Sequence, residues 1–163
     1  MVLDQQEQSE KLIEEFGRQI LVPGINEEGQ LNISKKKICI IGLGALGTVA
    51  SQYLVRAGVG EIHLVDHDII EKSNLHRQIN YDKDDVGKSK SVTSKHKLKN
   101  INDSTIIKEH SLNFQSFIKK NPNNNFDLIF DCTDNHQNKI FSSKYCKANK
   151  ISFVSISINS FTD

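Results

Sequence analysis

Residues 37–68 constrain the fold of this 163-residue chain more than any other stretch. An apolar run that contains Ile38, Ile40 and Ile41 leads into a glycine turn, and a helix-like segment then leads into a second apolar run that ends in Asp66. Continuous apolar runs of this kind are typical of parallel strands that are buried on both faces. The stretch therefore predicts a βαβ unit that binds a nucleotide.

The turn contains Gly42, Gly44 and Gly47 at the spacing G-x-G-x-x-G. The first glycine permits a tight turn, the second lets the backbone approach a phosphate, and the third lets the helix pack closely on the strand. Asp66 follows Gly47 by 19 residues, close to the separation of roughly 20 residues expected for an acid that binds a ribose. The alternatives are a tight turn without a ligand and an aspartate that merely ends a strand.

The segment after the turn has apolar residues at helical spacing, which predicts an amphipathic helix with one buried face. These residues are Val49, Ala50, Tyr53, Leu54 and Ala57. The N-terminus of this helix would direct free N–H groups at an anion.

The rest of the chain continues the alternation of strands and helices. We expect helices at 88–100 and 136–148, and strands at 105–110, 126–132 and 151–158. This order predicts an α/β fold with a doubly wound, Rossmann-like and mainly parallel sheet. Residues 67–87 form a polar connection, and connections of that length within a compact domain are usually functional.

The first 36 residues differ from the predicted core. Residues 4–17 resemble a polar helix with one apolar edge, and 18–36 form a looser stretch. We therefore expect an N-terminal helical extension at 1–36, which packs on the sheet or on a second copy of the chain, and a nucleotide-binding domain at 37–163.

Composition excludes several classes of function. The formal net charge of +1 gives no electrostatic reason to expect nucleic acid or a membrane as the main partner. The sequence has no apolar run near the roughly 20 residues of a membrane span, and its first residues do not resemble a signal peptide. Cys39, Cys132 and Cys146 are scattered, so we expect reduced thiols in a cytoplasmic protein.

In sheets of this type, ligands bind beyond the carboxyl ends of the strands. That rule brings the glycine turn together with Asp66 and Asp134, and Arg77 and Lys90 are the nearest cations. Two carboxylates and two cations suit nucleotidyl transfer better than hydride transfer, because an acid can hold Mg²⁺ while cations neutralise charge on the phosphates. The residues therefore favour ATP over a dinucleotide.

Several longer motifs resemble a known family, the MoeB/ThiF/HesA-type adenylyltransferases that activate ubiquitin-like sulfur-carrier proteins and are related to ubiquitin-activating enzymes. The most specific motifs are Ser-Asn-Leu-His-Arg-Gln at 73–78 and Asp-Cys-Thr-Asp-Asn at 131–135. The resemblance extends from about residue 16 to about residue 157, and further matching segments lie at 18–21, 42–47, 57–60, 65–68 and 86–90.

The resemblance implies a role for each matching position. Arg18, Arg77, Lys90 and Asp134 would be catalytic, with Asp134 on Mg²⁺ and Arg18 supplied across a homodimer interface to the partner's site. The positions that would bind ATP are Gly42, Gly44, Ala45, Gly47, Asp66, Ser73, Asn74, Leu75, His76, Arg77, Lys90, Asp134 and Asn135. The implied reaction adenylates the C-terminal glycine of a ubiquitin-like sulfur carrier that ends in Gly-Gly, of the molybdopterin or thiamine type.

Other interpretations stay open at this point. Arg18 and Arg77 could form surface ion pairs, Lys90 could belong to a solvated basic face, and Asp134 could cap the following helix. The whole chain could be a non-catalytic partner subunit, an NAD-dependent oxidoreductase or a relative that adenylates a carboxylate on a tRNA nucleoside.

The sequence departs from the family in three respects. One is the segment Ser-Ile-Ser-Ile-Asn-Ser at 155–160, where the family usually has small, glycine-bearing residues. Ala45 stands where the family usually has a further glycine. Family members also generally continue well beyond residue 163, with the zinc ligands, any thioester-forming cysteine and much of the carrier-docking surface. We therefore expect a fragment or truncated member that binds ATP with Mg²⁺ weakly and has little activity alone.

Overall fold

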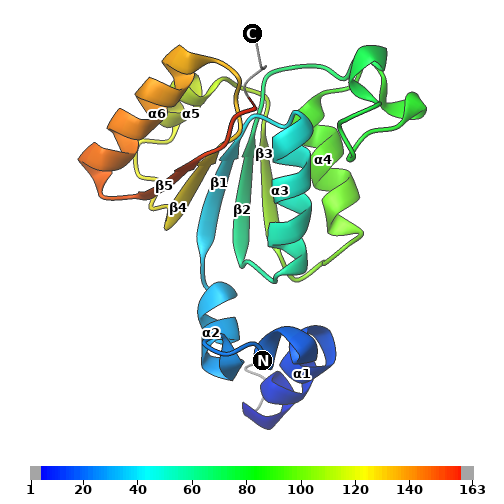
Figure 1. Ribbon diagram of the computed structural model, residues 1–163, viewed down its shortest axis with the longest axis vertical. Coiled ribbons are helices and arrows are strands. Elements are labelled where there is room, and N and C mark those ends of the chain that lie inside the picture. Colours follow the sequence, from blue (N-terminus) through cyan, green and yellow to red (C-terminus); the bar gives the residue numbers. More distant parts are fainter. Residues whose placement is uncertain (1–4, 159–163) are drawn as a thin grey trace, which may run out of the picture.

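The computed structural model describes residues 5–158 and contains one sheet of five parallel strands in the order β3-β2-β1-β4-β5 (Figure 1). The strands are β1 (Lys37–Ile41), β2 (Glu61–Val65), β3 (Ile106–His110), β4 (Leu128–Asp131) and β5 (Ser152–Ser155). The sequence places β1 in the centre because its residues are apolar on both faces. The predicted doubly wound, Rossmann-like sheet is confirmed.

Helices cover both faces of this sheet (Figure 1). They are α3 (Ala45–Arg56) and α4 (Lys90–Lys99) on one face, and α5 (Phe114–Lys120) and α6 (His136–Asn149) on the other. Two short 3-10 helices, η1 (Lys72–Asn74) and η2 (Lys83–Asp85), lie within the connection at 67–87 that was expected to be a polar loop.

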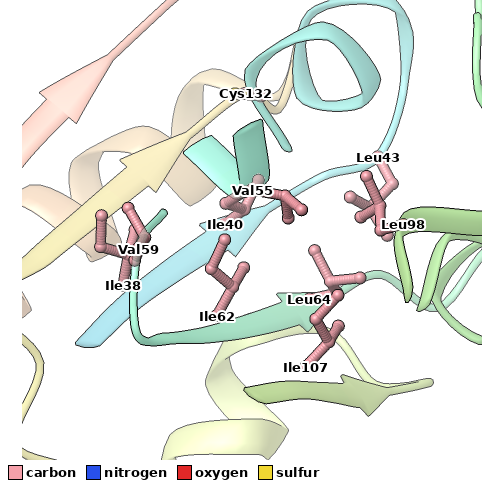
Figure 2. Packing of buried hydrophobic residues seen from close by; sticks show 10 residues of the cluster. All are labelled: Ile38, Ile40, Leu43, Val55, Val59, Ile62, Leu64, Leu98, Ile107 and Cys132. Carbon is pink, nitrogen blue, oxygen red and sulfur yellow. The ribbon is translucent and has the colours of Figure 1, made fainter. Parts of the chain in front are cut away.

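The alternation of side chains along the strands produces two apolar clusters. The cluster towards α3 and α4 includes Ile40 and Leu64 (Figure 2). The cluster on the opposite face includes Cys39 and Phe117. All three cysteines are free and buried, and burial raises the pKa of the Cys132 and Cys146 thiols to about 11. They pack as small apolar groups, as buried cysteines commonly do.

The N-terminal extension contains two helices, α1 (Gln5–Ile20) and α2 (Asn26–Ile33), which lie below the amino ends of the strands in Figure 1. The prediction of a looser stretch at 18–36 was wrong for α2. Gln30 explains the difference, because its side chain is fully buried and donates to the backbone oxygen of Ala57 at 3.0 Å. Gln19 donates to Gln30 at 2.7 Å. These tertiary contacts are not visible in the local sequence. The boundary between residues 36 and 37 stays a prediction.

The buried face of α3 was predicted incorrectly in part. Val49 and Tyr53 are exposed, and the helix instead buries Thr48, Ser51 and Val55 against the sheet. Small residues let the helix approach the strands closely, and the Thr48 and Ser51 hydroxyls donate to backbone oxygens of the helix and its N-cap. Ala50 and Leu54 do pack against the apolar cluster, so apolar spacing identified part of the buried face and missed the small polar residues Thr48 and Ser51.

Two other expectations changed. The short helix α5 was not predicted; Asn113 begins it by accepting from the Ser116 N–H at 2.9 Å. The last strand is shorter than the predicted 151–158. Within the described residues 5–158, no helix has the length and apolar character needed to cross a membrane.

Candidate functional site

A cavity of about 590 Å³ lies at the carboxyl ends of the strands, between the glycine turn and the segments that follow β2, β3 and β4. Its position is the one that parallel sheets of this class use for ligands. Eight of the residues predicted to bind ATP line this cavity. They are Gly42, Gly44, Ala45, Asp66, Asn74, Arg77, Lys90 and Asp134.

The glycine turn has the geometry that its spacing predicts. Gly42 has a φ of +83°, a conformation that side chains disfavour. A Cβ at Gly47 would lie 1.9 Å from the Gly42 oxygen, so only glycine lets α3 pack here. Gly47 therefore shapes the turn and is not among the residues that line the cavity. Gly44 is the N-cap of α3 and has no side chain, which leaves the first N–H groups without a side-chain cap.

Two side chains hold the backbone of Leu43 within this turn. The Asp66 carboxylate accepts from the Leu43 N–H at 2.6 Å, and the Tyr81 hydroxyl donates to the Leu43 oxygen at 2.9 Å. Tyr81 was not predicted as a site residue. It is buried and comes from the connection at 67–87, so this connection folds back onto the turn.

Asp66 follows β2 and is buried. Its second oxygen accepts from the Asp68 N–H at 2.8 Å. Burial raises the pKa of the Asp66 carboxyl, while the two backbone N–H groups and Lys90 act in the opposite direction. A carboxylate has about four acceptor positions, so Asp66 can hold the turn and still accept from a ligand hydroxyl. Asp66 thus does more than end a strand, because its carboxylate holds the glycine turn; its binding of a ribose stays a prediction.

Lys90 begins α4 and has only 8% of its side chain exposed. Its ammonium lies 2.9 Å from an Asp68 carboxylate oxygen, which excludes the solvated basic face considered for this lysine. Asp68 also lines the cavity. It was part of a matching motif but was not predicted as a site residue, because the sequence did not show which acid would pair with Lys90.

Only some residues of the segment at 73–77 line the cavity. Asn74 is buried and joins Glu71 in a reciprocal cap of η1. Arg77 is exposed at the cavity and donates to the Ser73 oxygen at 2.9 Å. Across residues 5–158 no carboxylate forms an ion pair with Arg77, so the surface ion pair considered for it is not observed. The predicted residues Ser73, Leu75 and His76 are not among the lining residues.

Gln78 is a further lining residue that was not predicted. Its side chain is 3% exposed, and its Oε1 is buried without a hydrogen-bond partner in the described part of the chain. Buried amide atoms normally have partners. The last position of the Ser-Asn-Leu-His-Arg-Gln motif was the available signal for this residue.

Asp134 is exposed and lines the cavity, whereas Asn135 is not among the lining residues. Asn135 caps α6 instead, because its side chain accepts from the Gln137 and Asn138 N–H groups at 2.9 and 3.2 Å. The helix-capping alternative for Asp134 is therefore wrong, and its carboxylate stays accessible. The preceding turn is held by buried Asp131, which accepts from the Thr133 N–H at 3.0 Å.

The cavity has the oxygen ligands that Mg²⁺ prefers in nucleotide sites, where one or two carboxylates act together with the phosphates. Asp66, His67 and Asp68 also have ligand atoms within 4.8 Å of one another. However, Asp66 accepts from two backbone N–H groups and Asp68 pairs with Lys90. Glu71 also lines the cavity and accepts from the Ser73 hydroxyl at 3.0 Å. Asp134 is a lining carboxylate without an ion-pair partner among residues 5–158, which makes it a candidate ligand for the ion.

Arg18 lies outside this cavity. It is exposed on α1, at the opposite end of the sheet (Figure 1). In a single chain it cannot contact a ligand in the cavity.

The family of the chain follows from comparison of its sequence with known families. The model of the ThiF family matches residues 16–162. The chain belongs to the ThiF family. The adenylyltransferase and sulfurtransferase MOCS3 of Xenopus laevis is 33% identical over 137 residues, which are 80% of this chain and 29% of that protein. The adenylyltransferase and sulfurtransferase uba4 of Aspergillus niger is 40% identical over 120 residues, which are 74% of this chain and 25% of that protein.

Solved structures of ThiF-like fold agree with this assignment. The E. coli tRNA N6-threonylcarbamoyladenosine dehydratase TcdA has a TM-score of 0.81 at 25% identity, over 90% of this chain and 61% of TcdA. E. coli MccB has a TM-score of 0.72 at 31% identity, over 78% of this chain and 39% of MccB. This ThiF-family chain spans about a quarter to a third of the length of the curated relatives named above.

Proposed function

We propose that this ThiF-family chain is the ATP-binding part of an adenylyltransferase that activates the C-terminal glycine of a ubiquitin-like sulfur carrier. The observation that carries the proposal is the convergence of the glycine turn, Asp66, Arg77, Lys90 and Asp134 on one cavity. MOCS3 and uba4 are named adenylyltransferases, and TcdA has been solved in complex with ATP.

In this reaction a carboxylate oxygen of the carrier's terminal glycine attacks the α-phosphorus of ATP. A new P–O bond forms, the bond from the α-phosphorus to the bridging oxygen breaks, and pyrophosphate leaves with the bonding electrons. The product is an acyl adenylate. Negative charge on the phosphates must be neutralised throughout, and fixed cations and N–H groups do so without reorganising.

Four groups of this chain have the chemistry for these tasks. The Asp66 carboxylate would accept from the ribose, and the N–H groups at the start of α3 would face a phosphate. The Lys90 ammonium has three N–H groups and gives one to Asp68, so it can also donate to phosphate oxygens. Arg77 has N–H groups beyond those that contact Ser73 and His76.

Asp134 would hold Mg²⁺, which supplies charge neutralisation for the phosphates when it is bound. Arg18 would reach the cavity of a second copy of the chain, since it is exposed and lies far from the cavity of its own chain. This arrangement implies a homodimer.

Calorimetric titration of the chain with ATP and Mg²⁺ tests the nucleotide site. We expect binding, and we expect Lys90→Ala to raise the Kd about tenfold or more, because charge-assisted contacts to phosphate are strong. Lys99→Ala is the matched control, since Lys99 is exposed at the other end of the same helix and should leave the Kd unchanged. Lys90→Arg keeps the positive charge. If Lys90→Ala weakens binding only because it unfolds the chain, comparison with Lys90→Arg will reveal it.

The adenylation step is tested by ATP–pyrophosphate exchange with and without a carrier that ends in Gly-Gly. Exchange that depends on the carrier would support the proposal and overturn the expectation of little activity alone. ATP binding with no exchange would favour the non-catalytic subunit. Tight NADH binding without competition from ATP would favour the oxidoreductase and contradict the proposal.

A second candidate is a tRNA-modifying enzyme, which the similarity to TcdA over 61% of that chain favours. The net charge of +1 provides little attraction for tRNA. Exchange stimulated by tRNA and not by the carrier would favour this candidate.

A further inference from the structure

A chain of three hydrogen-bonded side chains crosses the sheet on the face that α5 covers. Nε2 of His63 on β2 lies 2.6 Å from a carboxylate oxygen of Glu61, and Nδ1 of His63 lies 3.0 Å from Nε2 of His110 on β3. The two imidazole rings are stacked, with centroids 5.0 Å apart. We call Glu61, His63 and His110 the histidine chain.

The chemistry of these groups fixes the direction of the hydrogen bonds. An ionised carboxylate can only accept, so His63 must donate to Glu61 through Nε2–H. A neutral His63 then has an acceptor at Nδ1, and His110 must donate to it through Nε2–H. A proton added to His63 would place two N–H groups against each other. A proton added at Nδ1 of His110 would leave both hydrogen bonds in place.

The histidine chain is packed in apolar surroundings. His63 is 4% exposed, and its ring meets Phe117 of α5 and Phe126 at its edges, with centroids 6.0 and 5.0 Å away. The His110 ring lies 4.4 Å from Phe117. The charged groups around the histidine chain are Lys37 on β1, Lys108 and Glu109 on β3, and Lys95 on α4.

Two contacts connect this cluster to the cavity. The backbone oxygen of His110 accepts from the Asp66 N–H at 3.1 Å. Phe117 packs against Phe114 with centroids 6.3 Å apart, and Phe114 lines the cavity. The backbone of β3 therefore holds Asp66, and the rings of the histidine chain reach the cavity wall at the start of α5 through Phe117 and Phe114.

We propose that the histidine chain is a proton-sensitive clamp that holds α5 and the adjoining wall of the cavity most firmly while both rings are neutral. A proton on His63 would break its hydrogen bond to His110, and a proton on His110 would place a charge beside Phe117. A positive charge beside Phe117 would be poorly solvated, and this burial outweighs the attraction of Glu61 and Glu109, while Lys37 and Lys108 add repulsion. Acidification should therefore loosen α5 and weaken ligand binding in the cavity. The link to the cavity rests on the proposed ATP site, but the clamp itself does not.

The titration of the rings agrees with this geometry. Burial lowers the pKa of His63 to about 4 and also lowers the pKa of His110. A group whose pKa is lower in the folded state stabilises the fold above its unfolded pKa, here about 6.5, and loses that contribution as the pH falls towards the folded value. For His63 the window is therefore about pH 6.5 to 4, and only its lower end overlaps the range from 4.5 to 2 that Glu61 affects.

Urea unfolding of the full chain between pH 7.5 and 5.5 tests the clamp without any nucleotide. A histidine that stays neutral at pH 5.5 lowers the folding equilibrium constant about tenfold, so we expect about that loss or more in the wild type. His110→Gln keeps a donor for His63 and removes one titrating group whose pKa is lowered in the fold, so its loss should be smaller than that of the wild type. His96→Gln is the control, because His96 is exposed on α4, and it should behave as the wild type does.

Nitrogen NMR of the imidazole rings gives a second measurement that does not depend on a variant folding. We expect His63 to be the neutral Nε2–H tautomer and to titrate below pH 5. Titration of His63 near pH 6.5, or identical pH dependence in the wild type and His110→Gln, would overturn the clamp.

Binding of ATP, measured over the same pH range, tests the link to the cavity. Titration of the ATP phosphates affects the Kd equally in all samples, so the test is the difference in pH dependence of the Kd between variants. We expect the Kd of wild type and His96→Gln to rise more steeply towards pH 5.5 than that of His110→Gln. Equal slopes would overturn the link, whereas no ATP binding at any pH would contradict the proposed function and leave the unfolding and NMR results to decide the clamp.

Discussion

The two ends of β2 each have an acidic side chain, but these acids are held in opposite ways. Glu61 at the start of the strand receives Lys108 at 2.9 Å and His63 at 2.6 Å, with Lys37 at 3.3 Å. The pKa of Glu61 is lowered to about 2 although burial opposes this. Asp66 beyond the end of the strand accepts mainly from backbone N–H groups, and burial raises its pKa.

Under the proposed function, this difference separates an acid that only stabilises the fold from one that would also bind a ligand. At the amino end of β2 the cations and the carboxylate satisfy one another, so little capacity is left for binding. At the carboxyl end, Arg77 and Asp134 line the cavity without an ion pair to each other or to other described residues. Unpaired charges of both signs around one cavity favour a ligand that brings its own charges, such as a nucleotide with its metal ion.

The largest expected effect comes from Asp66→Ala. The Leu43 and Asp68 N–H groups would lose their acceptor, and Leu43 is buried. We expect the free energy of unfolding to fall by about 2–3 kcal/mol and ATP binding to be lost, measured by urea unfolding and calorimetry. Glu61→Ala should lower stability and keep ATP binding at neutral pH. Loss of binding in both variants to the same extent would remove the distinction between the two ends of β2.

An effect of intermediate size is expected for Glu61→Gln, and it should depend on pH. Because the pKa of Glu61 is about 2 in the fold and ordinarily 4.5, its charge stabilises the fold above pH 4.5 and stops doing so as the pH falls through 2. Lys108 is half exposed, so we expect a difference of only about 1–2 kcal/mol from wild type. Urea unfolding at pH 5 and pH 2 measures it. A difference that is unchanged at pH 2 would show that packing, not charge, holds Glu61.

The sequence predicted the parts of the fold that depend on local patterns. The apolar runs gave the parallel strands, and the glycine spacing gave the turn, with Gly42 and Gly47 in the expected roles. The motifs also identified eight of the lining residues, among them Asp66, Arg77 and Lys90. These features need only neighbours in the sequence and the rule that ligands bind beyond the strand ends.

The missed features depend on partners far apart in the chain. Asp68 pairs with Lys90 across 22 positions, and Tyr81 supports the turn across 38. The helix α2 is stabilised by Gln30 reaching Ala57. His63 and His110 are on separate strands and become neighbours only through the register of β2 and β3. Such pairings cannot be predicted from hydrophobic periodicity or from the secondary-structure propensities of the residues.

The smallest expected effect concerns Ala45, the position where this chain departs from the family's glycine. Ala45 is the first residue of α3 and lines the cavity, and its backbone N–H is the same with or without a methyl group. We therefore expect Ala45→Gly to change the Kd for ATP by less than about threefold and to lower stability by roughly 0.5 kcal/mol.

Ala50→Gly is the matched control for Ala45→Gly, because Ala50 lies in the interior of the same helix and is not among the residues that line the cavity. It should cost about 1 kcal/mol of stability and leave the Kd unchanged. If Ala45→Gly instead tightened ATP binding tenfold, the methyl group would obstruct the phosphates. The turn of this chain would then favour a ligand other than ATP in the cavity at the carboxyl end of β2.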